Sequence, residues 1–292
     1  SEGLTKMETI ELKSLVQFTQ GKIEETFEFW QQQFDDEWGG FNRAPKFMLP
    51  NAWQTLLRYG VQTKNEQCLI QTKVTLDRIA FGGVYDQLKG GFSRYSVDPY
   101  WKVPHFEKML YDNGQLLSLY SNAYKVFGEA HYQTVVEETI NWLKDEMLAQ
   151  EAIFYSAIDA DSEGEEGKYY VWQSAELKTI LNDDFDLFQQ YYHVDGFGEW
   201  EHGNSILMRL TDDEDFAKQH QLSLEELQFM VAKWKKMLLP IREKRIQPHR
   251  DEKALTSWNA LTIVGLCDAF QAFQQIDYLS LAENAMHFII QN

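Results

Sequence analysis

The chain has 292 residues, of which 44% are hydrophobic and 25% are charged, a composition that is typical of a folded globular protein and excludes an intrinsically disordered one. Its 27 basic and 45 acidic residues give a net charge of −18, so a nucleic-acid partner is not expected because its phosphates would be repelled. The sequence contains no apolar run of 18 residues, so no membrane span is expected.

Helical periodicity dominates the chain. Apolar residues from Leu12 to Phe34 recur on one helical face and predict one long helix over 12–34, and a second stripe predicts a helix over 106–124. The helix expected at 254–273 is apolar on almost every side, so we expect it to be buried on most sides. The other predicted helices cover 51–62, 66–81, 130–149, 174–192, 212–219, 223–244 and 278–290.

A short motif, GGF-x-R, occurs at 39–43 and again at 90–94. Its spacing of 51 residues is that of one helical hairpin with its loops, so the repeat predicts an array of hairpins that present equivalent loops at one rim. An α-solenoid and a closed α/α barrel both fit such an array. The loops are long, irregular and rich in aromatic and charged residues, which favours the barrel, with a funnel-shaped site at one end.

A small β-hairpin is expected as an insert in this all-α fold. Its strands are predicted at 153–157 and 168–172, where aromatic and β-branched residues flank an acidic turn that contains glycine.

The segment 90–113 is the richest in side chains that bind ligands. Its aromatic rings and cationic groups are candidate substrate contacts, namely Phe92, Arg94, Tyr95, Trp101 and Lys108. His105 lies directly before a predicted helix and is the leading candidate for a general acid or base, because imidazole titrates near neutral pH. The alternative is a structural histidine that braces the start of the helix.

Carboxyl groups form a second set of catalytic candidates. Asp112 follows Lys108 by four residues, and the alternative is a plain surface ion pair worth only about 0.3–0.5 kcal/mol. Asp159 and Asp161 lie in the acidic segment 159–166, where mutual repulsion should raise pKa values toward those of a general acid, and the alternative is a solvated turn. This segment resembles the first half of a calcium loop, but Tyr170 replaces the bidentate glutamate, so no metal site is expected.

Two later loops complete the predicted rim. A tryptophan ring can cover the apolar face of a sugar while an asparagine amide bonds its hydroxyls, although Trp258 alternatively belongs to the core. The candidate substrate contacts outside 90–113 are Arg43, Trp200, Asn204, Asp251, Lys253, Trp258 and Asn259. The sequence has no glycine-rich nucleotide loop, nucleophile elbow or HExxH motif, so no cofactor is expected.

The two cysteines, Cys68 and Cys267, belong to no metal-binding or redox motif. They are expected to be free thiols packed in helices. Together with the absence of any Asn-x-Ser/Thr acceptor, this predicts a cytoplasmic protein.

Five motifs in order resemble those of the YyaL-type family, which includes the spermatogenesis-associated protein twenty proteins. They are GGFNRAPKF at 39–47, GGFSRYSVD with VPHFEKMLYDN within 90–113, FYSAIDADSEGEEGKYYVW at 154–172, GNSIL at 203–207 and R-x-x-P-x-x-D-x-K-x-LTSWN at 245–259. The resemblance implies a six-hairpin α/α toroid, similar to glycosidases and to N-acylglucosamine 2-epimerase. In that family a thioredoxin-like domain precedes the toroid and would be a partner of this chain.

The expected domain organisation is a single toroid over residues 1–292. About ten helical segments are predicted where a six-hairpin toroid needs twelve, so the toroid is expected to be truncated at its C-terminus, and the thioredoxin-like domain is absent. Asn42, Glu252 and Ala260 depart from the family pattern, and none of them is a catalytic candidate. The sequence carries no indication of the oligomeric state.

Three functions remain open at this stage. The first is an epimerase or isomerase of sugars, in which His105 would act with a second histidine such as His202 or His249. The second is a glycoside hydrolase, in which Asp159 or Asp161 would face Asp112 or Asp251. The third is a scaffold without catalysis that binds a carbohydrate or a protein.

Overall fold

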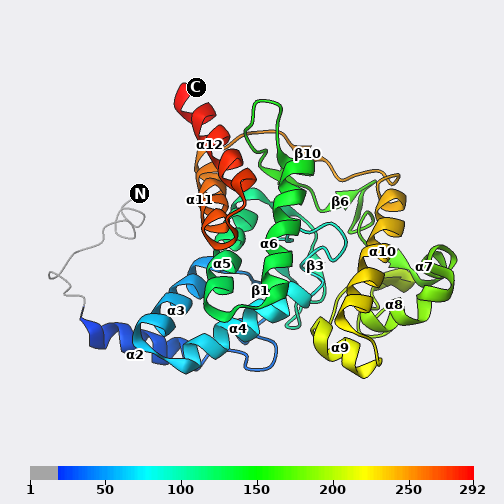
Figure 1. The fold of residues 1–292 in the computed structure, drawn as a ribbon, viewed down its shortest axis with the longest axis horizontal. Helices are drawn as coiled ribbons and strands as arrows, with labels where there is room; N and C mark the ends of the chain where they lie inside the picture. Colours follow the sequence, from blue (N-terminus) through cyan, green and yellow to red (C-terminus); the bar gives the residue numbers. More distant parts are fainter. Residues whose placement is uncertain (1–18) are drawn as a thin grey trace, which may run out of the picture. The chain divides into compact units, whose positions relative to one another are not determined.

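The computed structural model describes residues 19–292 (Figure 1). Helix α2 (Gln20–Gln31) belongs to one compact unit, and residues 35–292 form a second. The predicted helix over 12–34 is therefore present from Gln20, and its first part lies outside the described residues. The remaining helices are α3 (Pro50–Thr63), α4 (Glu66–Phe81), α5 (Leu110–Phe127), α6 (Ala130–Trp142), α7 (Ser174–Leu181), α8 (Phe185–Tyr191), α9 (Asp213–Gln219), α10 (Leu224–Arg242), α11 (Thr256–Phe273) and α12 (Ile276–Gln291).

Local signals in the sequence account for several helix boundaries. Helix α3 begins with Pro50, whose missing N–H would have no partner in the first turn. Helix α10 begins with a capping box, in which Ser223 and Glu226 satisfy each other's backbone N–H groups. The predicted helix over 174–192 is divided into α7 and α8 by a short 3₁₀ turn at Asn182–Asp184.

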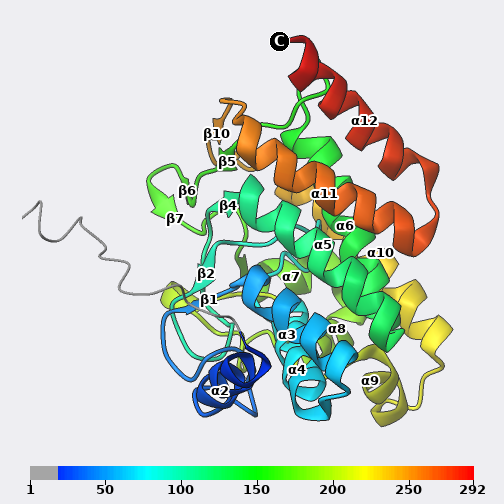
Figure 2. The same ribbon diagram turned by 90° about the vertical axis from the view of Figure 1, so that its left-hand side faces the viewer.

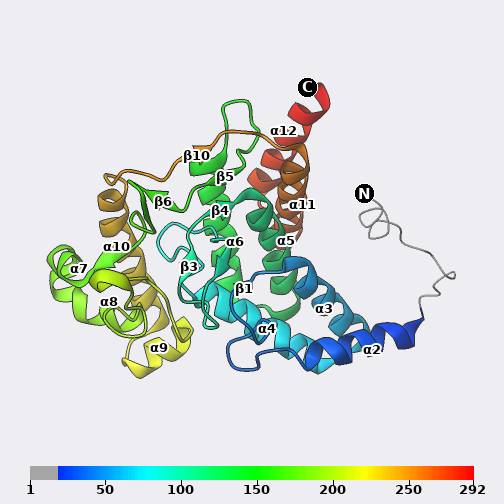
Figure 3. The same cartoon turned by 180° about the vertical axis from the view of Figure 1, so that it is seen from behind.

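Three antiparallel hairpins of helices form the frame of the second unit, α3 with α4, α5 with α6, and α11 with α12. Helices α3, α5 and α11 lie side by side in one row (Figure 2). The sequence between α6 and α11 holds most of the strands and the helices α7 to α10, which gather on the side away from α11 and α12 (Figures 1 and 3). The all-α array of hairpins predicted by the repeat is thus confirmed.

Glycines permit the close approach of α5 and α11. A Cβ atom added at Gly265 would lie 2.4 Å from the carbonyl oxygen of Gly114, and one added at Gly114 would lie 2.8 Å from the backbone of Thr262. We expect Gly114→Ala to lower the free energy of unfolding by about 1–3 kcal/mol, because the overlap with backbone exceeds the gain in helix propensity.

Urea denaturation monitored by circular dichroism measures this effect. Lys125→Ala, at an exposed position of the same helix, is the control and should change the free energy of unfolding by less than about 0.5 kcal/mol. Equal stability of the Gly114→Ala variant and the wild type would show that the two helices can separate without cost.

Short strands lead into each helix of the inner row. Strand β1 (Lys46–Phe47) precedes α3, β4 (Lys108–Met109) precedes α5, and β10 (Arg250–Asp251) precedes α11. One three-stranded sheet has the order β1–β2–β3, and another has the order β10–β5–β4. The remaining strands are β2 (Tyr95–Ser96), β3 (Pro104–His105), β5 (Ala157–Ile158), β6 (Asp161–Ser162), β7 (Glu165–Glu166), β8 (Trp172–Gln173) and β9 (Asn204–Ser205). The N-terminal ends of α3, α5 and α11 therefore share one rim.

The β-hairpin lies inside the segment where it was predicted, but its strands are different. It consists of β6 and β7, with Asp161 opposite Glu166. The two segments predicted to pair with each other have other partners: Ala157 in β5 lies between β4 and β10, and Trp172 in β8 pairs with β9. Backbone pairing to strands distant in sequence prevails over the local pattern here.

The two copies of the GGF-x-R motif have the same backbone structure. In the first copy, Asp35 accepts hydrogen bonds from the N–H groups of the residues two and three positions later, and Lys46 donates to Asp35 (2.7 Å) and to the carbonyl of Gly39 (2.6 Å). In the second copy, Asp86 accepts the equivalent N–H groups, and Lys108 donates to Asp86 (3.0 Å) and to the carbonyl of Gly90 (2.9 Å). The repeat thus includes an aspartate and a distant lysine that the sequence motif does not reveal.

Helix α11 is less enclosed than its composition predicts. Its inner face packs on α5, but Leu261 and Val264 are 36% and 55% exposed, so the expected burial on most sides is wrong for this chain. In the described part of the chain, no helix is both long and apolar enough to cross a membrane.

Candidate functional site

Equivalent asparagines fix the loops at the rim. Asn113 and Asn259 are the fourth residues of α5 and α11, and both are fully buried. Asn113 accepts the N–H of Phe92 (2.7 Å) and donates to its carbonyl (3.0 Å), and Asn259 does the same for Phe154 (2.9 Å for both bonds). The structure therefore uses Asn259 to hold a loop, as it uses Asn113.

Asp112 occupies the first turn of α5, directly beside this clamp. Its side chain is buried, with 7% of the residue exposed, and its Oδ2 atom has no hydrogen-bond partner. Burial raises the pKa of Asp112 to about 7, although Arg94 and Tyr111 lower it, and Glu107 raises it further. The start of a helix stabilises a carboxylate, so burial here outweighs the helix dipole. Asp112 can therefore both hold and release a proton near neutral pH.

Three neighbours give the surroundings of Asp112 their polar and aromatic character. Arg94 is 42% exposed at its side chain and forms an ion pair with Glu107 (3.2 Å). The ring of Tyr111 meets that of Trp258 edge to face, with 4.9 Å between centroids, which joins the starts of α5 and α11. Trp258 is half-buried, so part of its ring remains accessible.

His105 lies in β3 and is held by a carboxylate and a ring. Its Nδ1 atom is 2.6 Å from Oε1 of Glu166, and its ring stacks on Tyr95 with 5.0 Å between centroids. Its Nε2 atom is 3.7 Å from Oε2 of Glu107. Glu107 thus lies between His105 and Arg94, and it connects the histidine with the surroundings of Asp112.

Two residues of this rim, and the glutamate that binds His105, were not among the sequence candidates. Tyr111 and Glu107 stand inside the motif HFEKMLYDN, and their alternation with His105 was the signal that could have identified them. Glu166 was assigned to the acidic turn, and nothing in the local pattern indicates that it reaches a histidine 61 positions earlier. We define the Asp112 rim as Arg94, His105, Glu107, Tyr111, Asp112 and Trp258.

The other carboxylate candidates lie elsewhere. Asp159 is 3.7 Å from Nδ1 of His249, and both side chains are largely exposed. Asp161 lies in the β6–β7 hairpin and is exposed. Among residues 19–292, no hydrogen bond or ion pair joins either of them to Asp112. Asp251 forms an ion pair with Lys253 (3.0 Å) at the end of β10, directly before α11.

Several predicted ligand contacts are enclosed by protein. Phe92 and Trp101 have no exposed surface, and the indole Nε1 of Trp101 donates to the carbonyl of Trp38 (2.8 Å). Lys108 is paired with Asp86 rather than with Asp112, so the predicted i,i+4 pair is absent. Arg43 is exposed and lies 5.7 Å from the ring centroid of Phe41.

Trp200 and Asn204 do not belong to the Asp112 rim, and they line a cavity of about 870 Å³. Glu163, Glu165, Lys168 and His202 also line it. Glu166 contributes to the lining of this cavity as well and binds His105, so it connects the cavity with the Asp112 rim.

Comparisons with known proteins support the fold. No family model matches the chain. The chain is 34% identical over 289 residues to an uncharacterized protein of Caenorhabditis elegans, which covers 89% of this chain and 39% of that protein. It is 30% identical over 293 residues to spermatogenesis-associated protein 20 of Homo sapiens, which covers 90% of this chain and 37% of that protein. The chain thus spans less than two-fifths of the length of these relatives.

Among solved structures, the chain is similar to the glycoside hydrolase family 76 (mannosidase) Bt3792 of Bacteroides thetaiotaomicron. The TM-score is 0.52 at 10% identity, with 91% of this chain and 52% of that chain covered. This likeness shows a helical toroid fold like that of this glycoside hydrolase. Taken with the relatives, it shows that the chain is similar in sequence to part of spermatogenesis-associated protein 20 and adopts a helical toroid fold.

Proposed function

We propose that the Asp112 rim carries out acid–base chemistry on a carbohydrate, with Asp112 as the group that gives or takes the proton. The observation that carries this proposal is a buried carboxyl with a pKa of about 7 and one oxygen without a partner. A general acid or base works best when its pKa lies near the working pH, and perturbed carboxyls of this kind concentrate at functional sites.

The neighbours of Asp112 have the chemistry to hold a sugar. The accessible part of the Trp258 ring offers a flat apolar face, and the exposed Arg94 guanidinium offers donors for hydroxyl groups. Tyr111, which interacts with both Arg94 and Asp112, would position the carboxyl rather than react. In a hydrolytic reaction, Asp112 in its protonated form would give its proton to the leaving oxygen, and a second carboxylate would be required.

An isomerase or epimerase of sugars is the second candidate, and the geometry of His105 favours it. Glu166 holds Nδ1 of the ring, which leaves Nε2 directed toward the side where Glu107 lies. A carboxylate that orients an imidazole in this way is the arrangement of a general base, so His105 would remove a proton next to a carbonyl group. The other histidines proposed for this role, His202 and His249, have no hydrogen bond or ion pair with His105 in the described part of the chain.

A panel of mono- and disaccharides tests both candidates. Binding is measured by quenching of tryptophan fluorescence, and each sugar that binds is assayed for hydrolysis and for isomerisation. We expect Asp112→Asn to lower kcat/KM by about 10²-fold or more, with kcat of the wild type falling above pH 7 if Asp112 acts as an acid. His105→Gln should have the larger effect if the reaction is an isomerisation.

Asp161→Asn is the control, because Asp161 is an exposed carboxylate of the β6–β7 hairpin, outside the Asp112 rim. Loss of activity in Asp161→Asn with normal activity in Asp112→Asn would transfer the catalytic role to the acidic hairpin. If no sugar quenches the fluorescence of the folded chain, a scaffold role is the better description.

We propose that a thioredoxin-like domain accompanies the toroid, as the family resemblance implies, and that the protein acts in the cytoplasm. Mass spectrometry of the native protein from fractionated cells tests both statements.

A further inference from the structure

We propose that a second cavity, separate from the Asp112 rim, binds a small molecule through an oxyanion, either a phosphate or a carboxylate group. This site does not depend on the proposed function. The cavity has a volume of about 240 Å³, far above the ~10–15 Å³ that a single water molecule requires. Its charged lining residues are Asp86, Lys89, Lys108, Glu146, Arg242 and Arg250.

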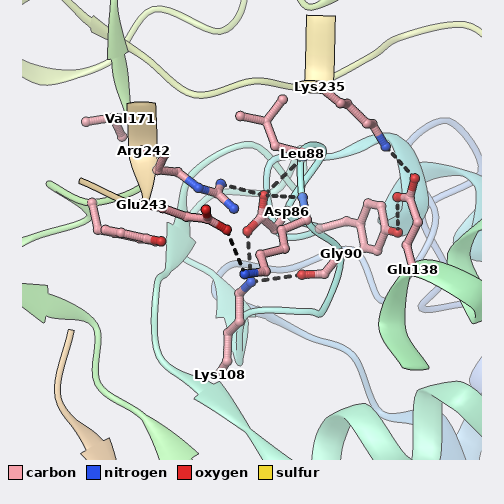
Figure 4. A network of polar contacts seen from close by, with 12 residues as sticks. Asp86, Leu88, Gly90, Lys108, Glu138, Val171, Lys235, Arg242 and Glu243 are labelled. Atoms are coloured by element: carbon pink, nitrogen blue, oxygen red, sulfur yellow. Dashed lines mark hydrogen bonds and ion pairs between the residues drawn. The ribbon is translucent and has the colours of Figure 1, made fainter. Parts of the chain in front are cut away.

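Two buried cations share one buried carboxylate at the base of this cavity (Figure 4). Lys108 Nζ is 3.0 Å from Oδ2 of Asp86, and Arg242 Nη1 is 2.8 Å from Oδ1. The side chains of both cations are only 2% exposed. Asp86 thus contacts both cations but balances only one of their two positive charges, and a buried charge without a counter-charge is costly.

Some hydrogen-bond donors of the lining residues have no protein partner. The Nε atom of Arg242 is buried and has no hydrogen-bond partner, and the same holds for Nε of Arg250. Lys108 uses its ammonium for Asp86 and for the carbonyl of Gly90, which leaves one of its three protons. A guanidinium and an ammonium that converge with free N–H groups are the groups that recognise phosphate and carboxylate oxygens.

The edge of the cavity holds more carboxylates than cations. Lys89 pairs with Glu146 (2.5 Å) and with the exposed Glu243 (3.2 Å). Arg250 pairs with the exposed Glu252 (2.7 Å). Two outer cations are thus accompanied by three carboxylates, so the positive surplus is confined to Lys108 and Arg242 at the buried base, where solvent screens charge least.

The first copy of the repeat provides an internal comparison. There Asp35 has a single cation, Lys46, and the charges match one to one. The second copy differs by the addition of Arg242, which comes from the last turn of α10. The inserted helices therefore convert a balanced structural pair into a site with surplus positive charge.

No residue of the Asp112 rim lines this cavity, and strand register directs the cavity's sheet residues to one face. Lys108, Ile158 and Arg250 lie opposite one another in the β10–β5–β4 sheet, and all three line the cavity. Met109, Ala157 and Asp251 form the next row and so point to the other face of the sheet. A molecule bound at one face does not occupy the other.

Isothermal titration calorimetry at constant ionic strength tests the site, with inorganic phosphate, glucose 6-phosphate, glucuronate and glucose as probes. We expect at least one anionic probe to bind with a Kd at or below about 1 mM, and glucose not to bind at this site. The phosphate and carboxylate probes distinguish the two sources of the oxyanion. Absence of binding by every anionic probe would overturn the proposal.

Arg242→Met is the decisive variant. It leaves Asp86 with Lys108 alone, which is the arrangement that the first copy already uses, and anion binding should weaken at least about 10-fold. Lys168→Met, at an exposed lysine of the 870 Å³ cavity, should bind as the wild type does. Asp112→Asn should also leave anion binding unchanged, which separates this result from the proposed function.

If Arg242→Met does not fold, Arg242→Lys replaces it, because the charge is retained and the planar fork of donors is lost. Weaker anion binding by a folded Arg242→Lys supports the site. Equal binding by the wild type and the folded variant contradicts it.

Discussion

Replacement of Asp86 by asparagine is expected to lower the free energy of unfolding by about 3–5 kcal/mol. Burial raises the pKa of Asp86, yet Arg242 and Lys108 hold it well below its ordinary value, so the carboxylate is charged at all physiological pH values. The amide in Asp86→Asn keeps one oxygen but removes the charge. Two buried cations would then face each other without a counter-ion.

Denaturation in urea, monitored by tryptophan fluorescence, measures how much Asp86→Asn lowers the free energy of unfolding. Asp35→Asn is the matched control from the first copy of the repeat, and it should cost less because only one cation, Lys46, loses its partner. The double variant Asp86→Asn with Arg242→Met should recover part of the lost stability, since the surplus charge is removed with the carboxylate. A loss in Asp86→Asn no larger than in Asp35→Asn would contradict the charge count at this site.

Relative to the wild type, Asp112→Asn is expected to become more stable as the pH rises. Replacement of an ordinary paired aspartate has the opposite effect, because the paired carboxylate stabilises the folded chain at higher pH. The pKa of Asp112 is raised from 3.8 to about 7 in the folded chain. Below pH 4 the carboxyl is protonated in both states and has no effect on stability. Between pH 4 and pH 7 the unfolded chain releases the proton while the folded chain retains it, so stability falls as the pH rises.

At pH 8 the penalty reaches its full value of about 4 kcal/mol, because one pKa unit corresponds to about 1.4 kcal/mol. The stability of Asp112→Asn relative to the wild type should therefore rise between pH 4 and pH 8 by up to this amount. Asp77→Asn is a control of opposite sign: although burial raises its pKa, His131 and Lys73 lower it overall, so the carboxylate contributes stability above pH 4. A difference between Asp112→Asn and the wild type that does not vary with pH would show that Asp112 does not titrate as described.

The helices could be predicted from the sequence because each is determined by its own periodic stripe. The pairing of Lys108 could not, because its carboxylate lies 22 positions earlier and the competing Arg242 lies 156 positions after that carboxylate. A lysine four residues before an aspartate suggests an i,i+4 pair, but a lysine in a strand directly before a helix does not share the helical spacing.

The candidate site was predicted in part. His105 and Asp112 were singled out for their chemistry, and the structure connects them through Glu107. The link to Glu166 depends on how the β6–β7 hairpin folds back, and residue types alone do not encode that contact. Aromatic residues such as Phe92 and Trp101 were assigned to the rim because they adjoin glycine and charged residues, but the loops are thick enough to have a core of their own.

The insert between α6 and α11 has a consequence for how the chain folds. Ser118 on α5 donates a hydrogen bond to Asp268 on α11, 150 positions later, so the central pair of helices forms only through a very long chain closure. Closure of such a loop is entropically costly, and contacts of high sequence separation slow folding. The helices α7 to α10 have their own apolar cluster and can fold within that loop, which shortens its effective length. During synthesis, the glycine face of α5 remains uncovered until α11 has left the ribosome, and this interval is when the nascent protein is most prone to aggregate.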